Sequence, residues 1–317
     1  MKYPQIYRYT IKYNREFWIF CCLYIFFISG FITIYIIQYE SVREYVIKKV
    51  FRILPTLFCS YFILWFVVKI FDFLGYNTFW SNIKEIEWLQ GATLMRYFIW
   101  QGVGGEPINA PTWTLFAEVL FYGICLLLFN LIKNKPKITI ISMITLQIIN
   151  LLIAFQFEQL FYVLRWFSYI TIIIFGVILY YLHSKRINLK EYSVFSIVNY
   201  LIMISNILFF DNIHYKEFPY VISFFYAYLI FIIALLLNEK ININQIIYKI
   251  AKISYSLYLI HVPFGNIILN LIYKYFNNIS YFYPLIITII IIFLISSIQQ
   301  KYMDIFSKKI INKILKE

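Results

Sequence analysis

Charged residues are scarce in this chain. Only 14% of its 317 residues are Asp, Glu, Lys or Arg, whereas 62% are hydrophobic. A soluble globular domain is about half apolar and roughly a quarter charged, so the composition excludes an ordinary soluble domain. Glycine and proline are also few, with nine and eight residues. Their scarcity excludes collagen-like and low-complexity chains.

Cysteine is scarce too, and its placement indicates no site. The four cysteines lie inside apolar stretches, without a Cys-x-x-Cys pair and without the spacing of metal ligands. We interpret them as packing residues and predict no metal site. A cleavable signal peptide is not expected, because the first apolar run is too long and no small-residue cleavage site follows it.

What the chain has instead is a series of long apolar stretches. They run far past strand length, and helices satisfy every backbone polar group in lipid. A span needs about 20 apolar residues. The predicted fold is therefore all-α, a polytopic integral membrane bundle of about nine transmembrane helices. The predicted spans are residues 17–39, 54–74, 112–132, 138–157, 160–182, 192–210, 218–237, 253–273 and 282–300.

We expect one membrane domain, residues 17–300, between a basic N-terminal tail, 1–16, and a cytoplasmic basic tail, 301–317. The net charge of +13 is interpreted as basic cytoplasmic loops that face membrane lipids, with no nucleic-acid partner. The N-terminal tail does not fit this orientation. With nine spans and a cytoplasmic C-terminus the tail would be outside, although its Lys and Arg residues favour the cytoplasm. Either a preceding helix is absent or the span count is off by one. The longest connection, 75–111, is expected to hold a short interfacial or re-entrant helix.

Two ionisable residues inside predicted spans are candidates for function, since such residues are costly in lipid. Glu118 lies about one and a half turns into its helix. It could serve a reaction, or pair with a basic neighbour and lock two helices. Ser254, Tyr258 and His261 are spaced i, i+4, i+7 and share one helix face. That face could move a proton or hold a polar ligand, or it could form hydrogen bonds between helices.

Cations gather before the second span. Lys48, Lys49 and Arg52 lie within one helical turn, with Arg43 ahead of them. Such a cluster attracts phosphate groups; the alternative is the ordinary positive-inside signal with lipid contact.

Two weaker features concern helix packing and helix ends. Ser29 and Gly30 would allow close helix approach in the first span. Lys69 and Asp72 are interpreted as a snorkelling pair rather than a site.

Four motifs, taken in order, resemble the acyltransferase-3 family of membrane O-acyltransferases, which includes bacterial polysaccharide and lipopolysaccharide O-acetylases. The family has a Phe-Phe-x-x-Ser-Gly-Phe helix and a basic Arg-Arg-x-x-Arg-Ile-x-Pro stretch. A Trp-Ser/Thr-Leu-x-x-Glu-x-x-Phe-Tyr helix and a Ser-Tyr-x-x-Tyr-Leu-x-His helix follow. In this chain the four motifs are Phe26–Phe31, which has one residue fewer between the phenylalanines and the serine, Lys48–Pro55, Trp113–Tyr122 and Ser254–His261.

The resemblance implies an enzyme of the bacterial cytoplasmic (inner) membrane, an acyltransferase that transfers groups other than amino-acyl groups. It would move an acyl group, expected to be acetyl, to a hydroxyl of a cell-envelope glycan or lipid-linked sugar. Acyl-CoA (acetyl-CoA) would be a co-substrate, with no tightly bound cofactor. The resemblance also implies roles for the candidate residues. The cations Lys48, Lys49 and Arg52 would bind the CoA phosphates.

Glu118 would orient or deprotonate a group near the acceptor side. His261, with Tyr258, would support the acyl tunnel or replace a histidine that family members usually carry on one additional first helix. This sequence has no histidine before His183, so we expect that helix to be absent. The alternatives are an N-terminally truncated, inactive acyltransferase, and a transporter or flippase for a lipid-linked glycan. A transporter explains the helices but not the order of the motifs.

Overall fold

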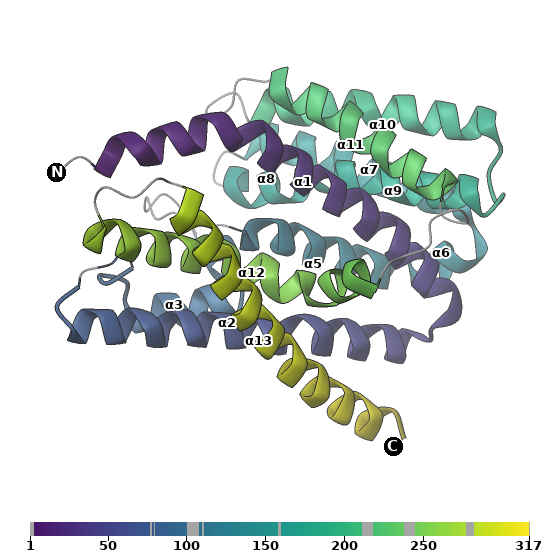
Figure 1. Ribbon diagram of the computed structural model, residues 1–317. Coiled ribbons are helices and arrows are strands. Elements are labelled where there is room, and N and C mark those ends of the chain that lie inside the picture. The colour runs from purple at the N-terminus through teal and green to yellow at the C-terminus, as the bar shows by residue number, and fades with distance from the viewer. Residues whose placement is uncertain are drawn as a thin grey trace. The chain divides into compact units, whose positions relative to one another are not determined.

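The protein is all-helical wherever the structure describes it (Figure 1). No β-strand occurs in that part of the chain, which confirms the predicted all-α class. The computed structural model describes residues 3–76, 78, 80–99, 108–109, 111–157, 160–210, 218–237, 245–276 and 282–316.

The chain divides into two compact units. Unit 1 comprises Met1–Val42 and Phe116–Asn242, and unit 2 comprises Arg43–Leu115 and Ile243–Glu317. The helices of unit 1 are α1 (Tyr3–Tyr39), α6 (Phe129–Asn134), α7 (Pro136–Gln156), α8 (Phe161–Ser168), α9 (Ile170–His183), α10 (Leu189–Phe210) and α11 (Phe218–Leu236). Those of unit 2 are α2 (Val42–Phe73), α3 (Glu85–Ala92), α4 (Arg96–Ile99), α12 (Gln245–Tyr275) and α13 (Phe282–Lys316). Helix α5 (Thr112–Leu127) begins in unit 2 and ends in unit 1.

Among the described residues, six helices are long and apolar enough to cross a membrane. Shorter apolar helices occupy the positions of the other predicted spans. Each predicted span therefore coincides with an apolar helix, while the count of nine stays a prediction. The six are Val42–Phe73, Pro136–Gln156, Val163–His183, Leu189–Phe210, Ile247–Tyr273 and Phe282–Lys316, and the shorter ones are Cys21–Ile37, Thr112–Leu127 and Ser223–Leu236.

Several helices continue past the predicted membrane boundaries. Helix α1 is continuous from Tyr3, and α13 continues to Lys316 beyond the last predicted span. With 35 residues, α13 is about 52 Å long, at about 1.5 Å per residue. The hydrocarbon core of a bilayer is only about 30 Å thick. The predicted basic tails are therefore helical where the structure describes them, and the domain boundaries stay predictions.

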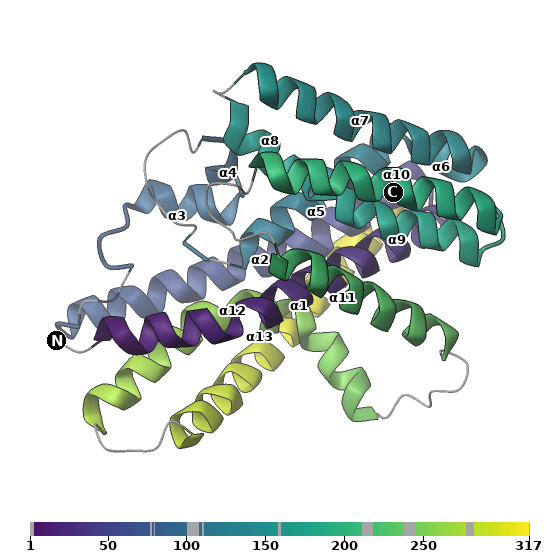
Figure 2. The same ribbon diagram turned by 90° about the horizontal axis from the view of Figure 1, so that it is seen from above.

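Two glycines allow α1 and α9 to cross at close range in unit 1. A Cβ atom added to Gly30 would lie 2.2 Å from the Ile173 carbonyl oxygen. One added to Gly176 would lie 2.2 Å from the Phe27 carbonyl oxygen. Small residues let helix backbones approach in this way, so the predicted role of Gly30 is confirmed. Helices α7, α9 and α10 also pack against one another (Figure 2).

Aromatic rings hold α1 between α9 and α11. The Phe27 side chain is fully buried, and its ring centroid lies 5.4 Å from that of Phe224 and 5.1 Å from that of Tyr228. The Phe31 ring lies 5.4 Å from Tyr180 of α9 in an edge-to-face arrangement. Edge-to-face pairs of this kind add to the stabilisation that comes from burying the rings. The phenylalanines of the first motif are therefore packing residues.

In unit 2, Pro55 interrupts the hydrogen bonding of α2. Proline has no N–H, so the Phe51 carbonyl, four residues earlier, has no donor within the helix. Ser307 of α13 donates its hydroxyl to that oxygen at 2.7 Å. Gln299 of α13 also donates to the Thr56 carbonyl, at 2.9 Å. Helix α13 is thus stabilised against α2 by side chains that bind the α2 backbone.

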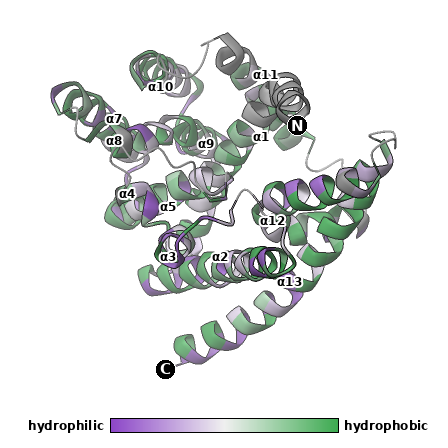
Figure 3. Ribbon diagram, turned by 90° about the vertical axis from the view of Figure 1, so that its left-hand side faces the viewer, coloured by the Kyte–Doolittle hydropathy of each residue, from purple (hydrophilic) through white to green (hydrophobic). Residues whose placement is uncertain are grey.

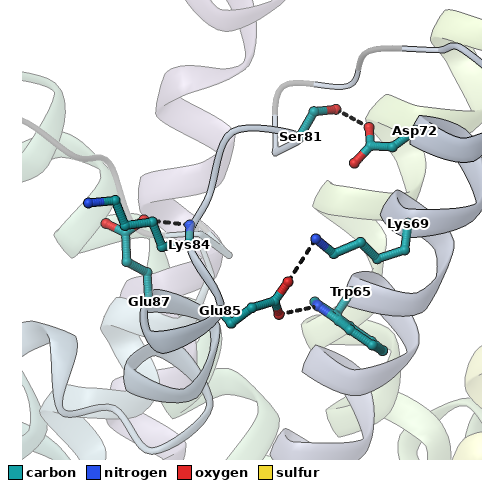
Figure 4. Close-up of polar contacts among 7 residues, drawn as sticks. All are labelled: Trp65, Lys69, Asp72, Ser81, Lys84, Glu85 and Glu87. Carbon is teal, nitrogen blue, oxygen red and sulfur yellow. Dashed lines mark hydrogen bonds and ion pairs between the residues drawn. The ribbon is translucent and has the colours of Figure 1, made fainter.

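The connection after α2 folds back and binds the end of that helix (Figure 4). Lys69 Nζ lies 2.7 Å from Glu85 Oε1, and Trp65 Nε1 donates to Glu85 Oε2 at 2.6 Å. Ser81 donates to the Asp72 carboxylate. The interpretation of Lys69 and Asp72 as a pair is therefore wrong, because each finds a partner in the connection. The hydrogen bond from Lys69 holds the pKa of the exposed Glu85 carboxyl below its ordinary value.

Gly30→Ala is expected to lower the free energy of unfolding by about 1–3 kcal/mol, because the added Cβ forces α1 and α9 apart. Gly123→Ala is the matched control, since a Cβ at Gly123 meets nothing within 4 Å. Thermal unfolding in detergent, followed by circular dichroism, measures both. Equal unfolding midpoints for the two variants would show that the close crossing is not needed.

Candidate active site

The third motif supplies a carboxylate that is linked to the first motif within unit 1. Tyr122 donates its hydroxyl to Glu118 Oε2 at 3.0 Å, and the Ser29 hydroxyl lies 3.1 Å from the Tyr122 oxygen. An ionised carboxylate only accepts hydrogen bonds, so the Tyr122 proton points to Glu118 and Ser29 donates to Tyr122. This chain of three groups orients the half-buried Glu118 carboxylate.

In unit 2, the fourth motif reaches the start of α5. The Tyr258 hydroxyl donates to the Pro111 carbonyl at 2.7 Å and also contacts the Thr114 hydroxyl. Thr114 Oγ1 lies 3.1 Å from the same Pro111 oxygen. Two hydroxyls therefore converge on one carbonyl just before α5. Thr114 and Glu118 occupy successive turns of α5.

His261 follows Tyr258 by one turn of α12. Its Nδ1 lies 2.8 Å from the Tyr258 carbonyl oxygen and 3.2 Å from that of Leu257. A carbonyl oxygen only accepts, so Nδ1 carries a proton; in the neutral form of the ring, Nε2 is then the acceptor nitrogen. A histidine that takes a proton from a hydroxyl needs such an acceptor nitrogen.

The segment of α12 that carries His261 is held through a second proline. Pro263 leaves the Leu259 carbonyl without a donor within the helix. Asn109 donates Nδ2–H to that oxygen at 2.7 Å, and both Asn109 and Leu259 are buried. The residues before α5 are thereby tied to α12. Sequence reasoning missed Asn109; the available signal was Pro263, whose presence inside an apolar helix requires a donor from elsewhere.

A cluster of buried hydroxyls lies at the start of α5. Thr112 Oγ1 is 2.7 Å from the Tyr97 hydroxyl and 3.4 Å from the Tyr61 hydroxyl, and it donates to the Asn109 carbonyl at 2.7 Å. Burial raises the pKa of Tyr97, so its hydroxyl stays protonated. A Cβ on Gly91 would lie 2.5 Å from the Tyr61 ring, which brings α3 against this cluster. Sequence reasoning missed both tyrosines, because the chain has 30 of them and no local pattern distinguishes these two.

The three candidate cations lie on α2, in the turns before Pro55. Arg52 is exposed, and Lys48 and Lys49 are half-buried. Arg43 differs from them, because its guanidinium donates to the Ile314 carbonyl of α13 at 2.9 Å and so caps the end of that helix.

Unit 2 therefore brings Tyr258 and His261 to the start of α5, while Glu118 belongs to unit 1. A further contact joins the second and fourth motifs, since the Tyr255 hydroxyl donates to the Ile53 carbonyl at 3.2 Å. Among the described residues, no three His, Cys, Asp or Glu side chains are grouped as a metal site requires.

The sequence model of a family described as Acyltransferase domain (Acyl_transf_3) matches residues 3–298. This chain belongs to the acyltransferase-3 family. No significant similarity was found among curated proteins or solved structures. Together with the apolar helices, family membership identifies a multi-pass membrane protein of the acyltransferase class.

Asn109→Ala is expected to lower the free energy of unfolding of this acyltransferase-3 member by about 1–3 kcal/mol, since the buried Leu259 carbonyl loses its donor. Pro263→Ala returns a backbone N–H to that carbonyl, so Asn109→Ala should cost less in the Pro263→Ala background. Unfolding of both single variants and the double variant measures the coupling. Additive effects would mean that Asn109 does not serve the carbonyl freed by Pro263.

Proposed function

We propose that this protein is a membrane-bound O-acyltransferase that moves an acyl group, expected to be acetyl, from acyl-CoA to a hydroxyl of a cell-envelope glycan. The observation that carries the proposal is the arrangement at His261. In a chain of an acyltransferase family, Nδ1 of this histidine is bound to the backbone carbonyl of Tyr258, one turn earlier in α12, which leaves Nε2 as the acceptor nitrogen of the neutral ring.

Transfer of an acyl group from a thioester to an alcohol needs a base for the hydroxyl and donors for the developing oxyanion. The acceptor oxygen bonds to the acyl carbon, the C–S bond breaks, and the hydroxyl proton passes through the base to the leaving thiolate. We assign the base to His261 Nε2.

Glu118 is assigned to the acceptor. Its carboxylate is oriented by Tyr122, whose oxygen in turn accepts from Ser29. A carboxylate held in this way accepts hydrogen bonds from sugar hydroxyls and fixes which of them faces the acyl carbon.

The CoA phosphates are assigned to Lys48, Lys49 and Arg52. Lys48 and Arg52 are spaced i, i+4 on α2 and share one face. Cations at this spacing bind phosphate oxygens through charge-assisted hydrogen bonds. With the positive-inside orientation, this turn faces the cytoplasm of a bacterial inner membrane, where acyl-CoA is supplied. The glycan acceptor would then be on the outer side.

Glu118→Gln is expected to abolish glycan acylation while leaving membrane insertion intact, because the neutral amide keeps the shape of the side chain but loses its charge. Membranes that contain the variant are supplied with radiolabelled acetyl-CoA, and label in the glycan is measured. Glu85→Gln is the control, since that carboxylate pairs with Lys69 outside the site. Unchanged acylation in Glu118→Gln would remove the role of Glu118.

The same assay separates the enzyme from a transporter or flippase for a lipid-linked glycan. A transporter moves glycan across the bilayer but incorporates no label from acetyl-CoA. Absence of labelling in wild-type membranes, with glycan transport present, would reject the acyltransferase proposal for this chain.

The triple variant Lys48→Gln, Lys49→Gln, Arg52→Gln is expected to raise the KM for acetyl-CoA by about tenfold or more with a smaller effect on kcat, since the phosphates do not react. A control with the same change in charge is Lys135→Gln, Lys185→Gln, Lys190→Gln, three exposed lysines of unit 1. An equal rise in KM for the control would show a general charge effect rather than a CoA site.

A further inference from the structure

The final part of α13, residues 301–316, packs within unit 2 by one face. Ser307 is buried on that face and donates to the Phe51 carbonyl at 2.7 Å. Two turns later, the Ile314 carbonyl accepts from Arg43 at 2.9 Å. Residues seven positions apart lie on the same side of a helix, so one side of this segment follows the first turns of α2.

The opposite side of the segment is strongly cationic. Its lysines are all exposed, and none forms an ion pair with a carboxylate of a described residue. The one carboxylate within the segment, Asp304, instead accepts from Gln300 at 2.6 Å and lies 4.0 Å from Lys252 of α12. We call this surface the α13 lysine face; it consists of Lys301, Lys308, Lys309, Lys313 and Lys316.

Large apolar side chains lie among these lysines. Tyr302 is 61% exposed, Ile305 is 58% exposed and Phe306 is 50% exposed. Figure 3 shows hydrophobic and hydrophilic residues alternating along the last turns of α13. A helix face in water gains nothing from these apolar groups, and a face in hydrocarbon could not hold the lysines. The combination is typical of a helix at the membrane interface.

The position of the segment agrees with that environment. It follows directly on the predicted span 282–300, and α13 is too long to be contained in the hydrocarbon core. The apolar residues 302, 305 and 306 come first, and four of the five lysines come after them. Along the helix the order is therefore hydrocarbon, interface and headgroup, with Tyr302 at the level where tyrosine is enriched.

We propose that the α13 lysine face binds the phosphate headgroups of anionic phospholipids, in the leaflet that surrounds the end of α13 and the start of α2. Charge complementarity selects the phosphate, and the exposed Tyr302, Ile305 and Phe306 select a lipid with acyl chains over a soluble phosphate. The α13 lysine face includes none of the three α2 cations assigned to CoA, so this proposal does not rest on the enzymatic one.

The test is binding of palmitoyl-oleoyl phosphatidylglycerol to the full-length protein in detergent, measured by native mass spectrometry against phosphatidylcholine with the same acyl chains. Wild type should prefer phosphatidylglycerol, and the preference should fall as salt rises. Lys309→Gln, Lys313→Gln, Lys316→Gln should weaken phosphatidylglycerol binding on the order of 100-fold, at roughly fivefold for each lysine. The control with equal charge change is again Lys135→Gln, Lys185→Gln, Lys190→Gln, which should retain the wild-type preference.

A second pair of variants keeps the test decisive if the triple variant fails to fold. Asn312→Glu places one negative charge on the lysine side of α13, and Asn134→Glu places one on an exposed position of unit 1. Only Asn312→Glu should weaken phosphatidylglycerol binding.

Equal loss in the α13 and control variants, or no preference for phosphatidylglycerol in wild type, would overturn the proposal. CoA binding can be measured in the same way. If the α13 variants lose CoA binding but keep phosphatidylglycerol binding, the lipid proposal is overturned in favour of a nucleotide site.

Discussion

In lipid, every backbone carbonyl must accept a hydrogen bond from the protein, and this constraint governs which helices of unit 2 bind one another. Two prolines inside apolar helices each free one carbonyl, at Phe51 and at Leu259, and water is not there to bind it. Ser307 of α13 serves the first and Asn109, just before α5, serves the second. The helix partners of unit 2 are thus chosen partly by these two carbonyls. Since the second one lies two residues before His261, the same constraint holds the candidate base in place.

Unit 1 depends on close approach instead of on a freed carbonyl. Gly30 and Gly176 let α1 and α9 cross, and the rings of Phe27 and Phe31 fill the space beside the crossing. Ser29, between these packing residues, points its hydroxyl to Tyr122 and so orients Glu118. The first motif therefore combines packing residues with one residue, Ser29, that helps to orient Glu118. A substitution that spreads the crossing would also displace the group that positions Glu118.

The sequence predicted the helical class and the positions of the apolar spans, because hydropathy reports directly on lipid exposure. It also predicted the role of Gly30, which depends on size alone. It could not identify Asn109 or Tyr97, since their partners are defined by tertiary contacts and not by spacing. For the same reason it paired Lys69 with Asp72, its neighbour on the helix, and missed Glu85. Basic stretches were expected to be loops or tails, yet Lys and Arg are good helix formers, and α2 and α13 extend through them.

Some basic residues of the loops and helix ends bind backbone carbonyls of the protein itself. A count of positive charges therefore overstates how many cations can bind an external anion. Arg43 binds a carbonyl in the last turn of α13, Arg186 binds the Lys133 carbonyl at the end of α6, and Lys133 binds the Glu40 carbonyl just after α1 at 2.5 Å. Each satisfies an end carbonyl and complements the negative end of a helix dipole. Cations used in this way are poor ligands for an external phosphate, because their donors are already directed at the backbone. Anion binding is therefore to be sought where no backbone carbonyl takes the charge, as on the α13 lysine face.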